Sequence, residues 1–170
     1  MSRAKVELEN YNPDWVLKFK SERVFLENTI GNWIYGNIEH VGSTAIPDMT
    51  AKPVIDIMVG IETLDIARPA IDILSNNGYA YSPYKGDVMH WFCKPSDAFR
   101  THHLHLIPYQ SPLWNERLLF RDILRCNKAV ANEYAQLKTL LANDYKEDRE
   151  AYTQKKWPFI KSVLEQYKDI

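Results

Sequence analysis

The sequence contains little that a secreted, disulfide-rich or nucleic-acid-binding protein would need. Only two cysteines occur among the 170 residues, Cys93 and Cys126, and they do not form a metal-type CxxC pair. Their scarcity is typical of reduced thiols in a cytoplasmic protein. The 21 basic and 22 acidic side chains give a net charge of −1, so no overall positive field indicates nucleic acid. Any site for an anion must therefore be local.

Several functional signatures are missing as well. The N-terminal residues lack the apolar segment of a secretory signal, and no apolar run approaches the length of a membrane span. There is no Walker loop, no GxGxxG and no nucleophile elbow of the GxSxG type, so nothing supports hydride or acyl transfer. The composition, 45% hydrophobic and 25% charged, is that of one globular domain covering residues 1–170.

The sequence does contain a clear alternation of helical and extended patterns. Helices are expected at about 13–31, 64–74, 112–126, 128–143 and 147–167, and Pro158 should kink or interrupt the last of them. Strands are expected at about 38–41, 54–59, 79–82, 88–94 and 101–107, the last three as an antiparallel meander. The order predicts an α/β (α+β) fold, a mixed sheet flanked by helices with a helical C-terminal part.

The stretch from Ile38 to Gly60 is the most informative part of the chain. Gly42 and Ser43 end an apolar run, and they can present backbone N–H groups and a hydroxyl to a phosphate. Asp56 interrupts a β-branched run, where an ionised carboxylate needs a partner or a metal ion. The alternative is a simple turn followed by one buried aspartate whose hydrogen bonds are satisfied.

Histidines mark a second strand. Because side chains alternate along a strand, His103 and His105 share one face, which we expect to be the face of Asp56. Two imidazoles at that spacing can bind a divalent metal or phosphate oxygens, and His40 and His90 could join them. The alternative is a hydrogen-bonded polar sheet face without a ligand.

Basic residues could complete an anion site. Arg117, Arg121 and Arg125 line one stripe of a helix, and arginine suits phosphate because its fork donates paired hydrogen bonds. The apolar neighbours of Arg121 suggest that it points inward, towards Gly42 and Ser43. Arg117 and Arg125 are instead expected on a solvated face.

Further phosphate-suited groups occur on other predicted elements. Tyr152 and Lys156 are one helical turn apart and could reach the same cleft, and Lys52 is a loop cation near the turn.

Several separated motifs resemble the GrpB family, which is also found as a domain appended to some bacterial dephospho-CoA kinases. They are Tyr11-x-Pro13-x-Trp15, the run from Ile38 to Thr44, Lys52 to Ile57, His103-Leu104-His105, Leu119 to Asp122, Glu133-Tyr134-x-x-Leu137-Lys138, and Tyr152 with Lys156, Phe159 and Ile160. The resemblance implies a nucleotidyltransferase-like fold. Val41-Gly42-Ser43 and Asp56 match that superfamily's pattern, but Met58 stands where a second carboxylate is expected.

From these residues and the fold that the resemblance implies, we expect a nucleotide or other phosphorylated small molecule as ligand, and from the composition we expect no membrane and no nucleic acid. The binding residues would be Gly42, Ser43, Thr44, Lys52, Arg121, Tyr152 and Lys156. Asp56 and His105 would be catalytic, and Asp56, His103 and His105 would hold Mg²⁺ or Mn²⁺. Because one carboxylate is thin support for two-metal chemistry, a non-catalytic nucleotide-binding module is the alternative. A histidine-metal hydrolase is a third candidate.

Overall fold

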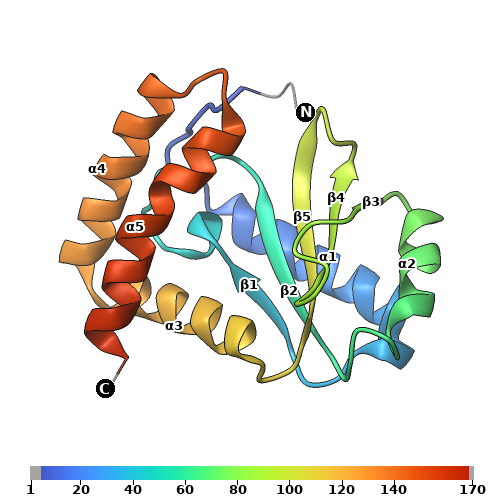
Figure 1. The fold of residues 1–170 in the computed structure, drawn as a ribbon. Coiled ribbons are helices and arrows are strands. Elements are labelled where there is room, and N and C mark those ends of the chain that lie inside the picture. Colours follow the sequence, from blue (N-terminus) through green and yellow to red (C-terminus); the bar gives the residue numbers. More distant parts are fainter. Residues whose placement is uncertain (1–4, 169–170) are drawn as a thin grey trace.

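The computed structural model of the protein describes residues 5–168 and contains a five-stranded sheet with helices on both faces (Figure 1). The helices are α1 Asp14–Ile30, α2 Arg68–Ser75, α3 Pro112–Cys126, α4 Lys128–Asp144 and α5 Arg149–Tyr167. The strands are β1 Ile38–Val41, β2 Ile55–Ile61, β3 Ala80–Ser82, β4 His90–Pro95 and β5 Arg100–Pro108. Two short 3₁₀ turns, Gly31–Trp33 and Ser43–Ala45, follow α1 and β1.

The strands are ordered β1-β2-β5-β4-β3, with β2 and β5 parallel and every other pair antiparallel. The predicted mixed sheet and the predicted meander of β3, β4 and β5 are therefore confirmed. The parallel register sets Asp56 beside His103 and Met58 beside His105. This register is what brings the two informative stretches of sequence together.

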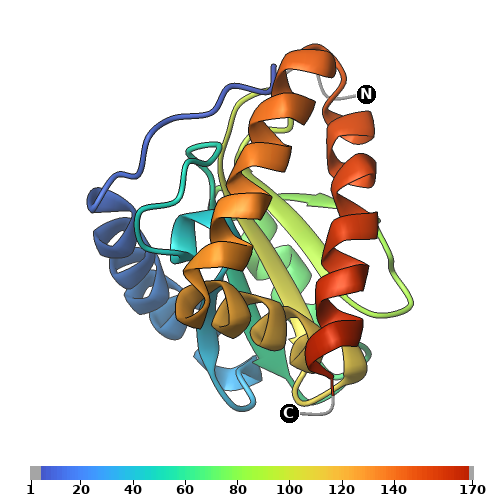
Figure 2. The same cartoon turned by 90° about the vertical axis from the view of Figure 1, so that its left-hand side faces the viewer.

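The alternation along β2 and β5 divides the core into two layers. Ile57 and Val59 point to the same side as Leu104 and Leu106, and all four are buried in the core that α1 and α2 cover. Met58 and Ile107 face the other side, where Trp114 of α3 covers them. Figure 2 shows α4 and α5 side by side beyond that second face.

Local sequence signals explain most of the helix boundaries. Ser111 accepts a hydrogen bond from the Trp114 backbone and Pro112 occupies the first turn, so α3 begins where the sequence predicts. The expected start of α2 at residue 64 is wrong, because Thr63 caps a separate turn and Pro69 sets the first turn of the helix. The helix α5 continues through Pro158 without interruption. No helix among residues 5–168 has the length and apolar character to cross a membrane.

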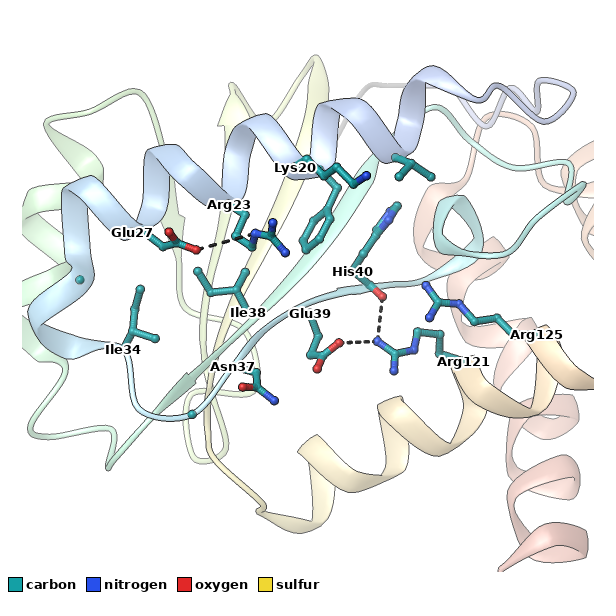
Figure 3. A pocket seen from close by; sticks show the side chains of 14 residues that line it. Lys20, Arg23, Glu27, Ile34, Asn37, Ile38, Glu39, His40, Arg121 and Arg125 are labelled. Carbon is teal, nitrogen blue, oxygen red and sulfur yellow. Dashed lines mark hydrogen bonds and ion pairs between the residues drawn. The ribbon is translucent and has the colours of Figure 1, made fainter.

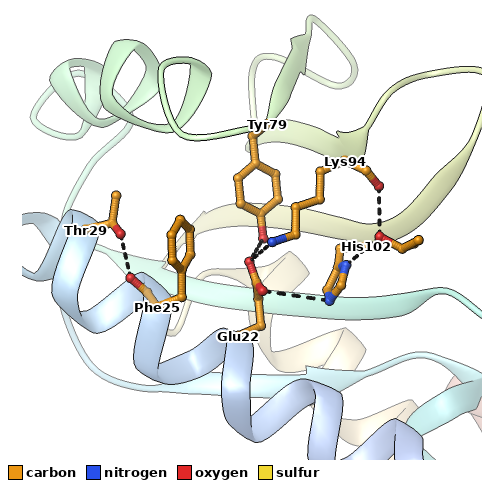
Figure 4. Close-up of polar contacts among 7 residues, drawn as sticks. Glu22, Phe25, Thr29, Tyr79, Lys94 and His102 are labelled. Atoms are coloured by element: carbon orange, nitrogen blue, oxygen red, sulfur yellow. Dashed lines mark hydrogen bonds and ion pairs between the residues drawn. The ribbon is translucent and has the colours of Figure 1, made fainter.

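A buried polar network connects α1 to the sheet on the face opposite Asp56 (Figure 4). The Glu22 carboxylate accepts hydrogen bonds from the Tyr79 hydroxyl, at 2.6 Å, and from the Lys94 ammonium. The His102 imidazole lies 3.8 Å from the same carboxylate, and burial lowers the pKa of His102 to about 4. The carboxylate of Glu22 therefore connects α1 to polar side chains from β4, from β5 and from the segment before β3, and we infer that its role is structural.

Replacing Glu22 by Ala should lower the free energy of unfolding by about 3–5 kcal/mol, because the substitution leaves a buried ammonium without its partner. The matched control is Glu27→Ala in the same helix, since Glu27 forms only an exposed pair with Arg23 at 3.7 Å. That control should change stability by less than about 1 kcal/mol. Urea denaturation followed by circular dichroism measures both, and equal effects would contradict the structural role of Glu22.

Candidate functional site

The site is built around Asp56, whose carboxylate contacts both predicted histidines. The Oδ1 atom of Asp56 accepts a hydrogen bond from Nδ1 of His103 at 3.0 Å, and Nε2 of His105 lies 3.5 Å from the same oxygen. The prediction that Asp56, His103 and His105 share one face of one sheet is confirmed. Their aliphatic neighbours point into the core under α1, as the alternation requires.

Arg117 joins these residues, which corrects the expectation of a solvated side chain. Its guanidinium donates a hydrogen bond to Nδ1 of His105 at 2.8 Å. Because a guanidinium only donates, Nδ1 of His105 accepts, and its proton resides on Nε2, facing Asp56. Arg117 follows the buried Trp114 by three residues, and this helical spacing was the signal that could have placed it inward. We call Asp56, His103, His105 and Arg117 the carboxylate–histidine network.

The protonation states in this network are set by burial and hydrogen bonding. Burial, reinforced by the positive charge of Arg117, lowers the pKa of His105 to about 4, and burial lowers the pKa of His103 as well. Burial alone would raise the pKa of Asp56. The hydrogen bonds from His103 and His105 outweigh that effect and hold it well below its usual value. At neutral pH an ionised carboxylate therefore lies between two neutral imidazoles.

Gly42 closes the other side of the carboxylate. Its backbone has a φ of 75°, and a Cβ atom added there would lie 2.5 Å from Oδ2 of Asp56. Only glycine permits both this conformation and this approach. One oxygen of Asp56 is thus hydrogen-bonded and the other lies against the turn.

The donor set does not fit the expected Mg²⁺ or Mn²⁺ ion. Only Oδ1 of Asp56 has hydrogen-bonding partners, so the set offers a single carboxylate, and the buried Met58 offers only a thioether, which is a poor ligand for a hard cation. Within residues 5–168, no group of three or more histidine, cysteine or acidic side chains is placed to hold a metal ion.

His40 and His90 lie on the opposite face of the sheet from Asp56, so they do not join the site. His40 stacks on Phe19 of α1, with ring centroids 4.8 Å apart. The Nε2 atom of His90 lies 2.8 Å from the Leu64 carbonyl oxygen.

Three lysines gather beside this network, and we call Lys52, Lys138 and Lys156 the lysine cluster. The ammonium groups of Lys52 and Lys156 lie 5.1 and 4.6 Å from the centre of the same ring, that of Tyr152. Lys138 is fully buried and donates a hydrogen bond to the Thr50 carbonyl at 2.6 Å. Sequence analysis predicted Lys52, Tyr152 and Lys156 for the site, but it treated Lys138 only as part of a family motif.

The lysine ammonium groups are costly to keep charged in the free protein. Burial lowers the pKa of Lys156 to about 8. Burial and the charge of Lys156 lower the pKa of Lys52 to about 7. Burial, with both other ammonium groups, lowers the pKa of Lys138 to about 6. Asp56 acts in the opposite direction on Lys52 and Lys156, so it is close enough to offset part of their repulsion.

The residues of the Gly42 turn differ in what their side chains can do. The Ser43 hydroxyl is hydrogen-bonded to Tyr134 of α4. The Thr44 hydroxyl is buried and bonds both His40, at 2.9 Å, and the Val54 carbonyl, at 3.1 Å. Because both of its hydrogen bonds are made within the protein, the hydroxyl does not face a ligand, and the predicted binding role of Thr44 rests on its backbone.

Arg121 does not face the Gly42 turn, contrary to the sequence-based expectation. It donates hydrogen bonds to Glu39 at 2.7 Å and to the His40 carbonyl at 3.3 Å. With Arg125 it lines a separate groove of about 800 Å³ between α1, β1 and α3 (Figure 3). Four residues turn a helix about 40° beyond a full revolution, which directs Arg121 to the outer strand β1 and leaves Arg117 over β5.

A model of the GrpB protein family matches residues 5–166. The chain belongs to the GrpB family. It is 37% identical to the glutamate-rich protein GrpB of Alkalihalophilus pseudofirmus, covering 96% of this chain and 97% of that one. The crystal structure of the conserved protein GrpB from Enterococcus faecalis superposes with a TM-score of 0.83 at 28% identity, over 95% of this chain and 99% of the other.

A weaker likeness links GrpB chains to a larger enzyme. The dephospho-CoA kinase of Mycobacterium leprae is 25% identical over 185 residues, and this chain covers 92% of its own length in the match. The matched region is only 45% of that enzyme, so this chain spans less than half of it.

Gly42→Ala should disrupt the network, because the added Cβ atom would displace the Asp56 carboxylate and the backbone would be strained. Thermal unfolding should shift to a lower temperature, by the equivalent of about 1–3 kcal/mol. Gly86→Ala is the control, since nothing lies within 4 Å of a Cβ atom there. A Gly42→Ala protein as stable as the Gly86→Ala protein would contradict the close approach described here.

Proposed function

We propose that this protein binds a phosphorylated small molecule, foremost a nucleotide, at the lysine cluster beside Asp56. The observation that carries the proposal is the gathering of three lysines beside Asp56, with Lys52 and Lys156 on one tyrosine ring and Lys138 buried next to them. The lowered pKa of each lysine agrees with this crowding. A polyanion placed among them would remove their mutual repulsion and would be held by charge-assisted hydrogen bonds.

The neighbouring residues support an anionic ligand of limited size. Arg117 keeps a positive charge near His105, and Gly42, which is exposed, leaves backbone accessible next to Ser43. With a net charge of −1 for the whole chain, the basic residues do not create an overall positive field. A compact phosphate group matches the lysine cluster better than an extended nucleic acid backbone, which needs a broad basic surface.

Binding in this proposal does not depend on a metal ion. The single carboxylate and the Met58 thioether argue against two-metal nucleotidyl transfer, whereas the lysines and Arg117 can neutralise phosphate directly. The proposal is therefore for a nucleotide-binding domain, and transfer of a nucleotidyl group is not needed to account for the lysine cluster.

Lys156→Ala should weaken nucleotide or pyrophosphate binding by about 10-fold to 150-fold, since one charge-assisted hydrogen bond contributes about 1.5–3 kcal/mol. The matched control is Lys155→Ala, because Lys155 is the preceding residue of α5 and is exposed. Isothermal titration calorimetry with a panel of nucleotides and pyrophosphate, with and without Mg²⁺ and Mn²⁺, measures both variants. Equal affinities for the two variants would refute the proposed site.

Anion affinity should fall as the pH rises from about 7 to 9. A bound anion raises the pKa of Lys52 and Lys156 above their free values of about 7 and 8. Below pH 7 both ammonium groups are already protonated in the free protein, so anion binding takes up few protons. At pH 8 the two lysines are partly deprotonated, so anion binding must take up protons from solvent, which weakens it. Sulfate is a suitable probe because its charge is constant over this range.

Calorimetry at pH 8 in two buffers of different ionisation enthalpy counts the protons taken up. We expect greater uptake for the unaltered protein than for Lys156→Met, and less at pH 5.5 than at pH 8. Uptake that is zero at pH 8 would contradict a role for the lysine cluster.

A further inference from the structure

One nitrogen atom in the site has no partner. Nδ1 of His103 must carry the ring proton, because it is directed at an ionised carboxylate that can only accept. The Nε2 atom of this neutral ring is then a bare acceptor. It is buried from solvent, and no hydrogen-bond donor in the described part of the chain contacts it. Buried acceptors without partners are rare in folded proteins, and such an atom calls for an explanation.

His105 shows how different the two imidazoles are. Its Nδ1 is occupied by Arg117 and its Nε2 proton faces Asp56, so both nitrogens have neighbours within the protein. In His103, by contrast, Nδ1 is fixed by Asp56, and the buried Nε2 has no hydrogen-bond partner among the described residues. An imidazole held at one nitrogen by a carboxylate, with a bare second nitrogen, is the arrangement that accepts a proton from a substrate.

The surroundings of His103 keep it neutral and close to the lysine cluster. Burial lowers its pKa, and the charges of Lys52 and Arg100 lower it further. The ring of Trp91 packs against it, with centroids 5.3 Å apart. A base that is unprotonated at neutral pH thus lies beside groups suited to bind phosphate. Because Nε2 is buried, the side chains that cover it must move before a ligand can contact it.

We propose that Nε2 of His103 is the general base of this site and that Asp56 is the positioning residue that orients it. This inference rests on the proposed function, since the substrate would be a nucleoside polyphosphate bound at the lysine cluster. In this reaction His103 removes a proton from an attacking water or alcohol. The attacking oxygen forms a bond to phosphorus, and the bond from phosphorus to the bridging oxygen breaks.

The remaining steps close the reaction without any oxidant or reductant. The leaving phosphate or pyrophosphate departs with the electron pair of the broken bond, and Lys52, Lys156 and Arg117 neutralise its charge. The proton on His103 then passes to the leaving group or to solvent, which restores the neutral base. Asp56 keeps its charge throughout and stabilises the imidazolium that forms briefly.

The first test reads the tautomer of His103 directly and requires no turnover. Long-range ¹H–¹⁵N correlation spectra of ¹⁵N-histidine-labelled protein at pH 7 should show Nδ1 of His103 protonated and Nε2 bare. In Asp56→Asn the population of this tautomer should fall, because an amide can both donate and accept at that position. A protonated Nε2 in the unaltered protein, or a tautomer that is unchanged in Asp56→Asn, would overturn the assignment.

The second test separates chemistry from binding. A panel of nucleoside triphosphates is incubated with the protein, with and without Mg²⁺, and released phosphate or pyrophosphate is followed by ³¹P NMR. His103→Gln should reduce turnover by about 100-fold or more while nucleotide affinity stays within about threefold. His102→Gln, one residue away on the opposite face, should retain turnover.

Each result bears on the proposal. Turnover that persists in His103→Gln, or an unaltered protein that binds nucleotides and turns over none of them, would overturn the role of His103 while leaving the binding site intact. Loss of binding in Lys156→Ala together with normal turnover would instead remove the proposed function on which this role rests. Loss of turnover in His103→Gln alone, with binding retained, supports both.

Discussion

The structure of the site depends on the cost of burying one ionised carboxylate inside a strand. Asp56 occupies a position that its neighbours fill with aliphatic side chains, so donors must be brought to it. The parallel pairing of β2 with β5 supplies His103 and His105, and α3 supplies Arg117 behind them. Gly42 leaves room for the second oxygen. Each of these residues is understandable as a response to that one charge.

The sequence predicts this central part well because strand alternation is a strict rule. Once β2 and β5 are neighbours in one sheet, the side chains at 56, 103 and 105 must emerge on one face, and the intervening leucines on the other. The family motifs add Gly42 and Ser43 in the right order. The turn before α2 was misjudged, since the apolar spacing from Leu64 resembles a helix while Thr63 and Pro69 delay its start.

The peripheral residues were harder to predict because their placement depends on how helices dock. Arg117, Arg121 and Arg125 look equivalent at intervals of four, yet the rotation of α3 sends Arg117 to His105 and Arg121 to Glu39. Lys138 gave no local signal, since its burial results from the contact of α4 with the loop at Thr50. Thr44 follows Gly42 and Ser43 in the sequence, which predicts a contact with phosphate. Its hydroxyl is instead hydrogen-bonded to His40, whose side chain lies on the other face of the sheet.

The strand β5 has a further property that follows from its consecutive histidines. His102 belongs to the Glu22 network under α1, and His103 belongs to Asp56 on the reverse side. Two unrelated polar networks thus use adjacent residues of one strand and are kept apart only by its pleat. A shift of one residue before His102 would exchange their surroundings. An insertion would turn His102 towards Asp56 and away from Glu22, whereas a deletion would turn His103 towards Glu22 and set Leu104 beside Asp56.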